Sequence, residues 1–417
     1  MVGIPTGQGE DSRIVIVGAG HAGGSVASML RQSGHRGPIT LVGDQPYPPY
    51  QRPPLSKAYL KGDTDLEALK LKVDGFYIQH DISLRLGSAV EAIEPAEKRV
   101  RLASGGHEPY DALILATGSR ARRLPLDGAD APNVHMLTSI ADAEALKAAM
   151  GPGRRLAIVG GGYVGLEVAA SARLLGAEAV IIERESRVLA RVACEPLSRF
   201  FNDYHIARGV EIVPGAIIES LERDTHGFVS GLHLADGRRI ACDFVLVGIG
   251  ASPCDELASS AGLACDGGIV VDAHGRTSDP DIYAIGDTTR RPLPLYGNRM
   301  VRLESVPNAL EQGKQVVHAI LGRAPPAPEV PWFWSDQYDL KLQIAGVTLD
   351  SEDFLIRGDI SAAKFAIFHM RGDQVRAVEA VNSPQEFMVG RQMVMSGRPV
   401  SREKLQDLAL TMKAIAA

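Results

Sequence analysis

The chain reads RIVIVGAGHAGGSVASML from Arg13 to Leu30. β-Branched residues precede the glycines and predict a short buried strand, and a helical pattern follows them. Gly18 makes the strand-to-helix turn, Gly20 lets backbone approach a pyrophosphate, and Gly23 lets the helix pack on the strand. This stretch therefore predicts a βαβ unit that binds the phosphates of a dinucleotide at the amino end of its helix.

An acidic residue follows the next predicted strand, which runs from Ile39 to Val42. Asp44 lies about 20 residues beyond Gly23, where dinucleotide-binding folds place the carboxylate that binds a ribose hydroxyl. Asp44 therefore completes the pattern of a dinucleotide site.

The same pattern occurs a second time, where residues 156–175 read LAIVGGGYVGLEVAASARLL. Gly160, Gly162 and Gly165 repeat the glycine spacing, and Glu183 follows the next predicted strand. Each loop lies between a strand and a helix, which is the context that the motif requires. The sequence therefore predicts two dinucleotide sites.

Two dinucleotides of different kinds imply FAD and a nicotinamide cofactor, because flavoenzymes pair a carrier that stays bound with one that exchanges. Three later strands end in small residues or an acid: YDALILATG from Tyr110, DFVLVGIG from Asp243 and IYAIGD from Ile282. With these motifs, the chain resembles the two-dinucleotide flavoproteins of the glutathione-reductase type, in which the NAD domain interrupts the FAD domain.

The positions of the cysteines limit which branch of these flavoproteins the chain can resemble. Disulfide reductases of this type carry a cysteine pair that takes electrons from the flavin, and peroxidases and oxidases of this type carry a single cysteine near the end of the first βαβ unit. Residues 49–57 here read PYQRPPLSK and contain neither. The four cysteines include no Cys-x-x-Cys pair, so we expect neither disulfide chemistry nor a structural zinc site, and no metal. Electrons are therefore expected to leave the flavin without a thiol relay.

Three segments are more specific than the glycine loops: RPPLSK at 52–57, RLESVPNA at 302–309 and PWFWSDQY at 331–338. They resemble the putidaredoxin-reductase type of NADH-dependent ferredoxin reductases, which serve cytochromes P450 and ring-hydroxylating dioxygenases. The resemblance extends over about residues 14–400. It implies an FAD-dependent NADH:ferredoxin oxidoreductase that passes electrons one at a time to a [2Fe–2S] ferredoxin.

Motifs and resemblance together predict the cofactor-binding residues. The FAD set is Gly18, Gly20, Ala22, Gly23, Asp44, Arg52, Lys57, Val90, Ala116, Thr117, Gly118, Gly286, Asp287 and Val306. The NADH set is Gly160, Gly162, Tyr163, Val164, Gly165, Glu183, Arg184, Arg191 and Gly250. Thr138 stands where the family often has an arginine that contacts FAD. Val306 replaces the tryptophan of the biphenyl-dioxygenase reductases, which favours the P450 branch.

The two cofactors carry out hydride transfer themselves, so no protein acid or base is required. Two side chains are nevertheless predicted to influence its rate. Lys57 resembles the family lysine beside flavin N5, and Glu167 resembles the carboxylate that pairs with it; the alternative is an ordinary solvated ion pair. Glu183 is expected to bind both adenosine ribose hydroxyls and to repel a 2′-phosphate. This predicts NADH, although the nearby Arg184 and Arg191 keep NADPH open.

Residues 288–301 contain arginines and no acid, in a chain whose net charge is −6. A local basic patch suits electrostatic steering of an acidic ferredoxin, and the alternative is a solvated loop. The predicted patch consists of Arg290, Arg291, Arg299 and Arg302. The acidic balance of the whole chain argues against nucleic-acid binding.

The chain has 417 residues, which predicts two or three domains at about 150 residues each. We expect a doubly wound α/β flavoprotein: an FAD domain at 12–120 and 250–330, an NADH domain at 121–249 and a carboxyl-terminal α+β interface domain at 331–417. No apolar run is long enough to span a membrane and no signal peptide is evident, so a cytoplasmic protein is predicted.

Three rival functions stay open at this stage. A rubredoxin reductase or a monodehydroascorbate reductase would share the flavin machinery and differ in the acceptor. A protein similar to apoptosis-inducing factor would instead use NADH binding to switch its assembly.

Overall fold

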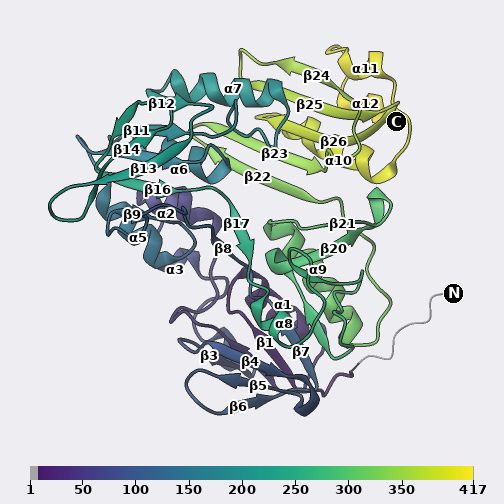
Figure 1. Ribbon diagram of the computed structural model, residues 1–417. Helices are drawn as coiled ribbons and strands as arrows, with labels where there is room; N and C mark the ends of the chain where they lie inside the picture. Colours follow the sequence, from purple (N-terminus) through teal and green to yellow (C-terminus); the bar gives the residue numbers. More distant parts are fainter. Residues whose placement is uncertain (1–7, 417) are drawn as a thin grey trace. The chain divides into compact units, whose positions relative to one another are not determined.

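The computed structural model describes residues 8–416, and the chain divides into two compact units (Figure 1). Among the described residues, the first unit comprises 8–51, 67–120 and 252–332. The second comprises 52–66, 121–251 and 333–416. Each unit is therefore discontinuous in sequence. The predicted three-domain boundaries remain a prediction.

The first unit is built on a five-stranded parallel sheet in the order β19-β7-β1-β2-β3. Its strands are β1 (Ile14–Val17), β2 (Ile39–Val42), β3 (Ile82–Arg85), β7 (Ala112–Leu115) and β19 (Ile282–Ala284). Side chains of a strand alternate between the two faces. Ile14 and Ile16 accordingly join a core cluster with α1 (His21–Gln32) and α9 (Val306–Ile320). Val15 and Val17 join a different cluster on the opposite face.

Smaller elements complete the first unit. The antiparallel strands β4 to β6 form one three-stranded sheet, and β18, β20 and β21 form another. The bounds are α3 (Leu66–Leu69), α4 (Phe76–Gln79), β4 (Val90–Glu94), β5 (Arg99–Leu102), β6 (His107–Pro109), α8 (Glu256–Ser260), β18 (Ile269–Val270), β20 (Thr289–Leu293) and β21 (Arg299–Val301), with 3-10 turns at Pro95–Glu97, Gly286–Thr288 and Pro294–Tyr296.

The second unit repeats the parallel sheet, in the order β12-β11-β10-β16-β9. Its strands are β9 (Val134–His135), β10 (Arg155–Val159), β11 (Glu178–Ile182), β12 (Val210–Val213) and β16 (Phe244–Val247). The same alternation sends Leu156 and Ile158 to one core cluster. Ala157 and Val159 belong to the cluster on the other face.

The carboxyl-terminal part of the second unit is a five-stranded sheet in the order β22-β23-β26-β25-β24, with α10 beside it (Figure 1). Leu340, Leu342 and Phe365 of this sheet belong to the same buried cluster as Leu156 and Ile158. The bounds are β22 (Trp332–Gln337), β23 (Leu340–Gly346), β24 (Asp353–Asp359), β25 (Lys364–Arg371), β26 (Gln374–Val381), α10 (Pro384–Ser396), α11 (Arg402–Gln406) and α12 (Met412–Ala416).

The remaining helices and strands surround the second parallel sheet or connect segments of the chain. They are a 3-10 turn at Pro53–Ser56, α2 (Ala58–Lys61), β8 (Ser119–Ala121), α5 (Ile140–Ala149), α6 (Tyr163–Leu174), α7 (Glu195–Ile206), β13 (Ile218–Arg223), β14 (Val229–Leu234), β15 (Arg239–Ala241) and β17 (Ala251–Pro253).

Two parallel Rossmann-like sheets and a sheet-rich carboxyl-terminal part confirm the predicted fold class. Along residues 8–416, no helix combines the length and apolar character needed to cross a bilayer.

Candidate functional site

The first glycine loop follows β1 and cannot accommodate side chains at two of its glycines. Gly18 has φ +111°, and a Cβ there would lie 2.2 Å from the carbonyl oxygen of Ala116. A Cβ at Gly23 would lie 2.0 Å from the carbonyl oxygen of Gly18. Backbone therefore packs against backbone at both positions, as the glycine spacing predicts.

The second glycine loop has the same construction. Gly160 has φ +106°, and its Cβ would lie 2.5 Å from the Gly248 carbonyl oxygen. A Cβ at Gly165 would lie 2.3 Å from the Gly160 carbonyl oxygen. At Gly162, by contrast, a Cβ would meet no protein atom within 4 Å, so the backbone there is open to a ligand.

The helices after both loops begin without a side-chain cap. The N-cap residues of α1 and α6 are Gly20 and Gly162, with no capping hydrogen bond and no acid in the first turn. In α5 and α9, Ser139 and Ser305 accept hydrogen bonds from the first turn. Uncapped N–H groups and the positive end of the helix dipole suit a pyrophosphate. Each unit therefore has one helix end that fits the pyrophosphate of a dinucleotide.

Carboxylates lie at the ends of the second strands, as predicted. Glu183 follows β11, where its Oε2 accepts from the Gly161 N–H at 2.6 Å and its Oε1 from the Glu185 N–H at 2.8 Å. These two bonds orient the carboxylate beside the second glycine loop. Asp44 follows β2 and is exposed, and Arg184 is exposed and pairs with Glu185.

Several predicted FAD residues gather around the first loop within the first unit. Gly286 has φ +79°, and its Cβ would lie 3.3 Å from the Cβ of Ala22. Its N–H donates to Gln312 Oε1 at 2.8 Å, so Gln312 is a supporting residue that the sequence did not reveal. Asp287 follows in the same 3-10 turn. Thr117 donates through Oγ1 to the Cys254 carbonyl oxygen at 2.6 Å.

The other predicted contacts lie at element ends. Val90 begins β4 and Val306 begins α9, while Gly118 has φ +67° after β7. In the second unit, Tyr163 and Val164 begin α6. A Cβ at Gly250 would lie 3.9 Å from Arg191 Nη2, which brings these two predicted residues together.

Lys57 and Glu167 form the predicted pair, with Nζ and Oε2 2.7 Å apart. The pair is not solvated, because the side chains are only 16% and 4% exposed. Glu167 also accepts from Ser56 Oγ and from Ser335 Oγ, each at 2.5 Å. The two serines lie in the quoted segments RPPLSK and PWFWSDQY, although their role was not predicted. Three donors thus satisfy one buried carboxylate and hold the Lys57 ammonium in place.

Arg52 lies next to the position where the family arginine is missing. Its guanidinium donates to the backbone oxygen of Thr138. The structure therefore brings an arginine side chain to this position from another segment of the second unit.

The predicted arginine patch needs one correction. Arg291 is only 2% exposed and forms an ion pair with the buried Glu311 at 2.9 Å and a hydrogen bond to Asn308 at 3.1 Å. It cannot present its charge to a partner. Its neighbour Arg290 pairs with Asp266.

The other two arginines reach the surface to different degrees. Arg302 pairs with Glu304 and is 22% exposed. Arg299, at the start of β21, is exposed.

Two family matches cover most of the chain. Residues 12–313 match the family described as pyridine nucleotide-disulphide oxidoreductase, and residues 332–416 match the family described as reductase C-terminal. The chain belongs to the pyridine nucleotide-disulphide oxidoreductases and, within them, to the ferredoxin reductases.

Individual relatives extend over nearly the full length. The chain is 50% identical to the probable ferredoxin reductase CtmF of Castellaniella defragrans over 97% of this chain and 99% of the relative. It is 41% identical to the putidaredoxin reductase CamA of Pseudomonas putida over 98% and 97%. These relatives confirm the predicted class, an FAD-dependent ferredoxin reductase that uses NAD(P)H.

Solved structures are equally similar. The covalent putidaredoxin reductase–putidaredoxin complex matches with a TM-score of 0.95 and 40% identity, over 97% of this chain and 98% of the other. The ferredoxin reductase for the CYP199A2 system from Rhodopseudomonas palustris matches with a TM-score of 0.93 and 37% identity, over 97% and 100%. The predicted fold and the resemblance are thereby confirmed.

Proposed function

We propose that the chain oxidises NADH and passes the electrons, one at a time, to a [2Fe–2S] ferredoxin that serves a cytochrome P450 or a ring-hydroxylating oxygenase. FAD, when bound, converts the two-electron hydride into single electrons. The observation that supports a ferredoxin as the electron acceptor is the similarity to a probable ferredoxin reductase over 97% of this chain. Val306 at the start of α9 favours the P450 branch.

The residues of each unit divide the work of binding. In the first unit, the uncapped amino end of α1 and the turn around Gly286 and Asp287 hold FAD. In the second unit, the uncapped amino end of α6 holds NADH. The Lys57 ammonium, fixed by Glu167, supplies positive charge that stabilises the negative charge developing during flavin reduction.

NADH is the preferred donor in this proposal because of Glu183. Both of its carboxylate oxygens accept backbone N–H groups, which holds a negative charge where the 2′-phosphate of NADPH would lie. The ratio of kcat/KM for NADH and NADPH tests this preference. A ratio that favours NADPH would remove Glu183 from this role.

The acidic ferredoxin partner is proposed to contact Arg290, Arg299 and Arg302 of the first unit. Arg299 supports this most directly because it is exposed. Electrostatic steering of this kind raises the rate of encounter more than the affinity.

A cytoplasmic location is part of the same proposal. Among the described residues, no disulfide joins the cysteines, which suits a reducing compartment; they are Cys194, Cys242, Cys254 and Cys265.

The decisive experiment is NADH-dependent reduction of cytochrome c by the holoenzyme with a panel of purified [2Fe–2S] ferredoxins. At least one ferredoxin should support turnover, and ferricyanide should be reduced without any ferredoxin. Rubredoxin and monodehydroascorbate belong in the panel, because turnover with either alone would replace the proposed acceptor. Dimerisation on NADH addition, with no turnover beyond ferricyanide, would instead favour an assembly switch.

A further inference from the structure

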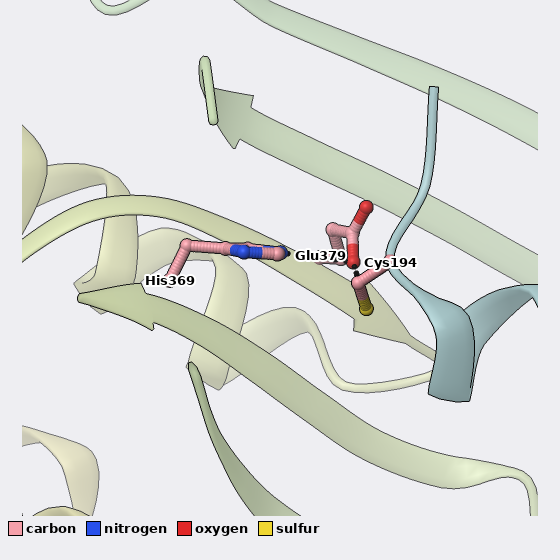
Figure 2. Close-up of side chains that lie close together, drawn as sticks. All are labelled: Cys194, His369 and Glu379. Atoms are coloured by element: carbon pink, nitrogen blue, oxygen red, sulfur yellow. Dashed lines mark hydrogen bonds and ion pairs between the residues drawn. The ribbon is translucent and has the colours of Figure 1, made fainter. Parts of the chain in front are cut away.

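Three side chains in the second unit converge on one carboxylate oxygen outside the cofactor-binding residues described above (Figure 2). Cys194 Sγ lies 3.0 Å from Glu379 Oε2, and His369 Nε2 lies 3.0 Å from the same oxygen. One potential ligand atom from each residue lies within 4.8 Å of both others. A thiol, an imidazole and a carboxylate are thus gathered in a space the size of one coordination sphere.

Regular secondary structure positions all three residues. Cys194 is the N-cap residue of α7, while His369 and Glu379 lie on the paired strands β25 and β26. Glu379 is opposite Ile367 in the antiparallel register, so His369 points to the same face of the sheet as a diagonal neighbour. Two of the three side chains are therefore held by paired strands, and the third lies at the end of a helix.

Burial separates this cluster from ordinary surface charges. The side chains of His369 and Glu379 are 6% and 1% exposed. Cys194 is half-buried. A buried carboxylate with two hydrogen-bond donors is satisfied, and the same three groups are also metal ligands.

The arrangement does not suit nucleophilic catalysis. An activated cysteine needs a base or a cation beside its sulfur, but here the carboxylate of Glu379 lies between the thiol and His369 (Figure 2). Burial, reinforced by the Glu379 charge, raises the pKa of the Cys194 thiol far above its usual value. The Cys194 thiol donates its hydrogen to Glu379 Oε2.

We propose that Cys194, His369 and Glu379 form a zinc site, with water as the fourth ligand. Thiolate sulfur, imidazole nitrogen and carboxylate oxygen are the ligands that Zn²⁺ takes in proteins, and three protein ligands plus water complete its tetrahedron. Tetrahedral Zn²⁺ separates such ligand atoms by about 3.3–3.6 Å. The two 3.0 Å separations must therefore open by roughly 0.5 Å. The thiol and imidazole ligand atoms, which lie within 4.8 Å of each other, must come to the same range.

The charges and protons of the three ligands balance when Zn²⁺ binds. Zn²⁺ displaces the thiol proton of Cys194 to solvent and takes His369 as a neutral ligand through Nε2, with the ring hydrogen on Nδ1. The thiolate and the Glu379 carboxylate together neutralise the metal, so no net charge is buried. No oxidant or reductant takes part in this step.

This site escaped the sequence prediction for a physical reason. The expectation of no zinc rested on the absence of closely spaced cysteines, whereas these ligands come from one cysteine and two distant strands. Zinc here would tie the residue preceding α7 to the carboxyl-terminal sheet and would stabilise the second unit through its binding free energy. The proposal does not depend on the electron acceptor.

The test uses tag-free holoenzyme that has been dialysed against a chelator and then desalted. Zn²⁺ is titrated and the bound metal is measured by mass spectrometry, and Co²⁺ is added to a second sample. One Zn²⁺ per chain is expected, with a rise in the thermal midpoint. Co²⁺ should give intense absorption bands at wavelengths longer than those the flavin absorbs, which report a tetrahedral thiolate site.

Two variants remove a ligand while keeping a hydrogen-bond donor to Glu379: Cys194→Ser and His369→Gln. Each should lose more than about 100-fold in zinc affinity, because even the loss of an outer-shell partner costs 10–100-fold. Cys265→Ser removes another half-buried thiol and should bind zinc as the wild type does. Thermal midpoints without metal check that each variant folds.

Two results would overturn the proposal. The wild type could take up no more zinc than the two ligand variants, or its Co²⁺ complex could show only the weak spectrum of octahedral oxygen ligation. If a ligand variant fails to fold, the wild-type stoichiometry and the Co²⁺ spectrum still decide. Ferredoxin turnover is measured separately, so failure of the zinc site leaves the proposed function standing.

Discussion

Among single residues, Lys57 of the Lys57–Glu167 pair is the one whose replacement we expect to change activity most clearly. Three donors satisfy Glu167, and the ion pair holds the Lys57 ammonium in place; we propose that this positive charge assists flavin reduction. Replacing Lys57 by Met should slow flavin reduction by NADH in stopped flow on the order of 100-fold, the usual size for loss of one preorganised charge. Lys341→Met, at an exposed position on β23, should leave the rate unchanged. An unaltered rate in Lys57→Met would remove this lysine from the mechanism.

The buried residue His205 is expected to make the free energy of unfolding depend on pH. It lies in α7, is fully buried, and its Nε2 is 2.8 Å from Gln337 Oε1. Burial lowers the pKa of His205 from 6.5 to about 4. Between these two pKa values the unfolded chain binds more protons than the folded chain, so the free energy of unfolding rises with pH. The contribution of neutral His205 to that free energy is complete above pH 6.5 and is lost as the pH falls through about 4.

The shift corresponds to about 3 kcal/mol of unfolding free energy. We expect His205→Gln to lose less stability than the wild type when unfolding in urea is compared at pH 7 and pH 4.5. His226→Gln, at an exposed turn position, is the matched control and should keep the wild-type pH dependence. Equal pH dependence in all three proteins would show that His205 does not titrate in this way.

At the scale of elements, the second glycine loop separates folding from cofactor binding. Gly165→Ala forces a Cβ to 2.3 Å from the Gly160 carbonyl oxygen, and overpacking of this kind costs about 1–3 kcal/mol. Gly162 has φ −80° and free space for a Cβ, so Gly162→Ala should keep the thermal midpoint of the wild type. It should nevertheless raise KM for NADH about tenfold or more by obstructing pyrophosphate. An unchanged KM in a folded Gly162→Ala protein would contradict NADH binding at α6.

The glycine loops also show why some elements are predictable. The helix predicted after the first glycine loop is α1, which ends at Gln32, and the corresponding helix after the second loop is α6, which ends at Leu174. Glycines that need positive φ or close packing mark where these elements begin. The order of strands β22 to β26 had no comparable local signal, because it depends on pairing between segments far apart in the chain.

The prediction that Arg291 belongs to a surface patch was wrong because side chains of a strand alternate between its two faces. In β20, residues 289–293 alternate between buried and half-buried positions, so consecutive arginines point to opposite faces. One of them meets Glu311 in the core. A count of arginines in a sequence window therefore predicts local charge but not which charges reach the surface.

At the scale of the whole molecule, the contacts found among predicted residues, such as Lys57 with Glu167 and Gly286 with Ala22, join residues that a motif or the resemblance supplied. The partners Ser335 and Gln312 were not predicted, since a serine and a glutamine carry no distinguishing pattern. The same holds for the cluster of Cys194, His369 and Glu379. Sites built from distant segments become visible only when the chain is folded.

The charge on the surface of the first unit leads to the last prediction. Of the predicted arginines, Arg299 at the start of β21 is exposed, whereas the side chains of Arg290 and Arg302 are 34% and 22% exposed, so Arg299 should contribute most to the attraction of an acidic ferredoxin. Arg299→Gln should lower kcat/KM for the ferredoxin up to about fivefold at low salt, the equivalent of one exposed charge pair. The difference from wild type should vanish at high salt, where surface charges are screened. Arg398→Gln, an exposed arginine of the second unit, makes the same change in net charge and should match the wild type. Ferricyanide reduction should respond to neither substitution, and equal losses in both variants would mean that net charge, and not this patch, guides the partner.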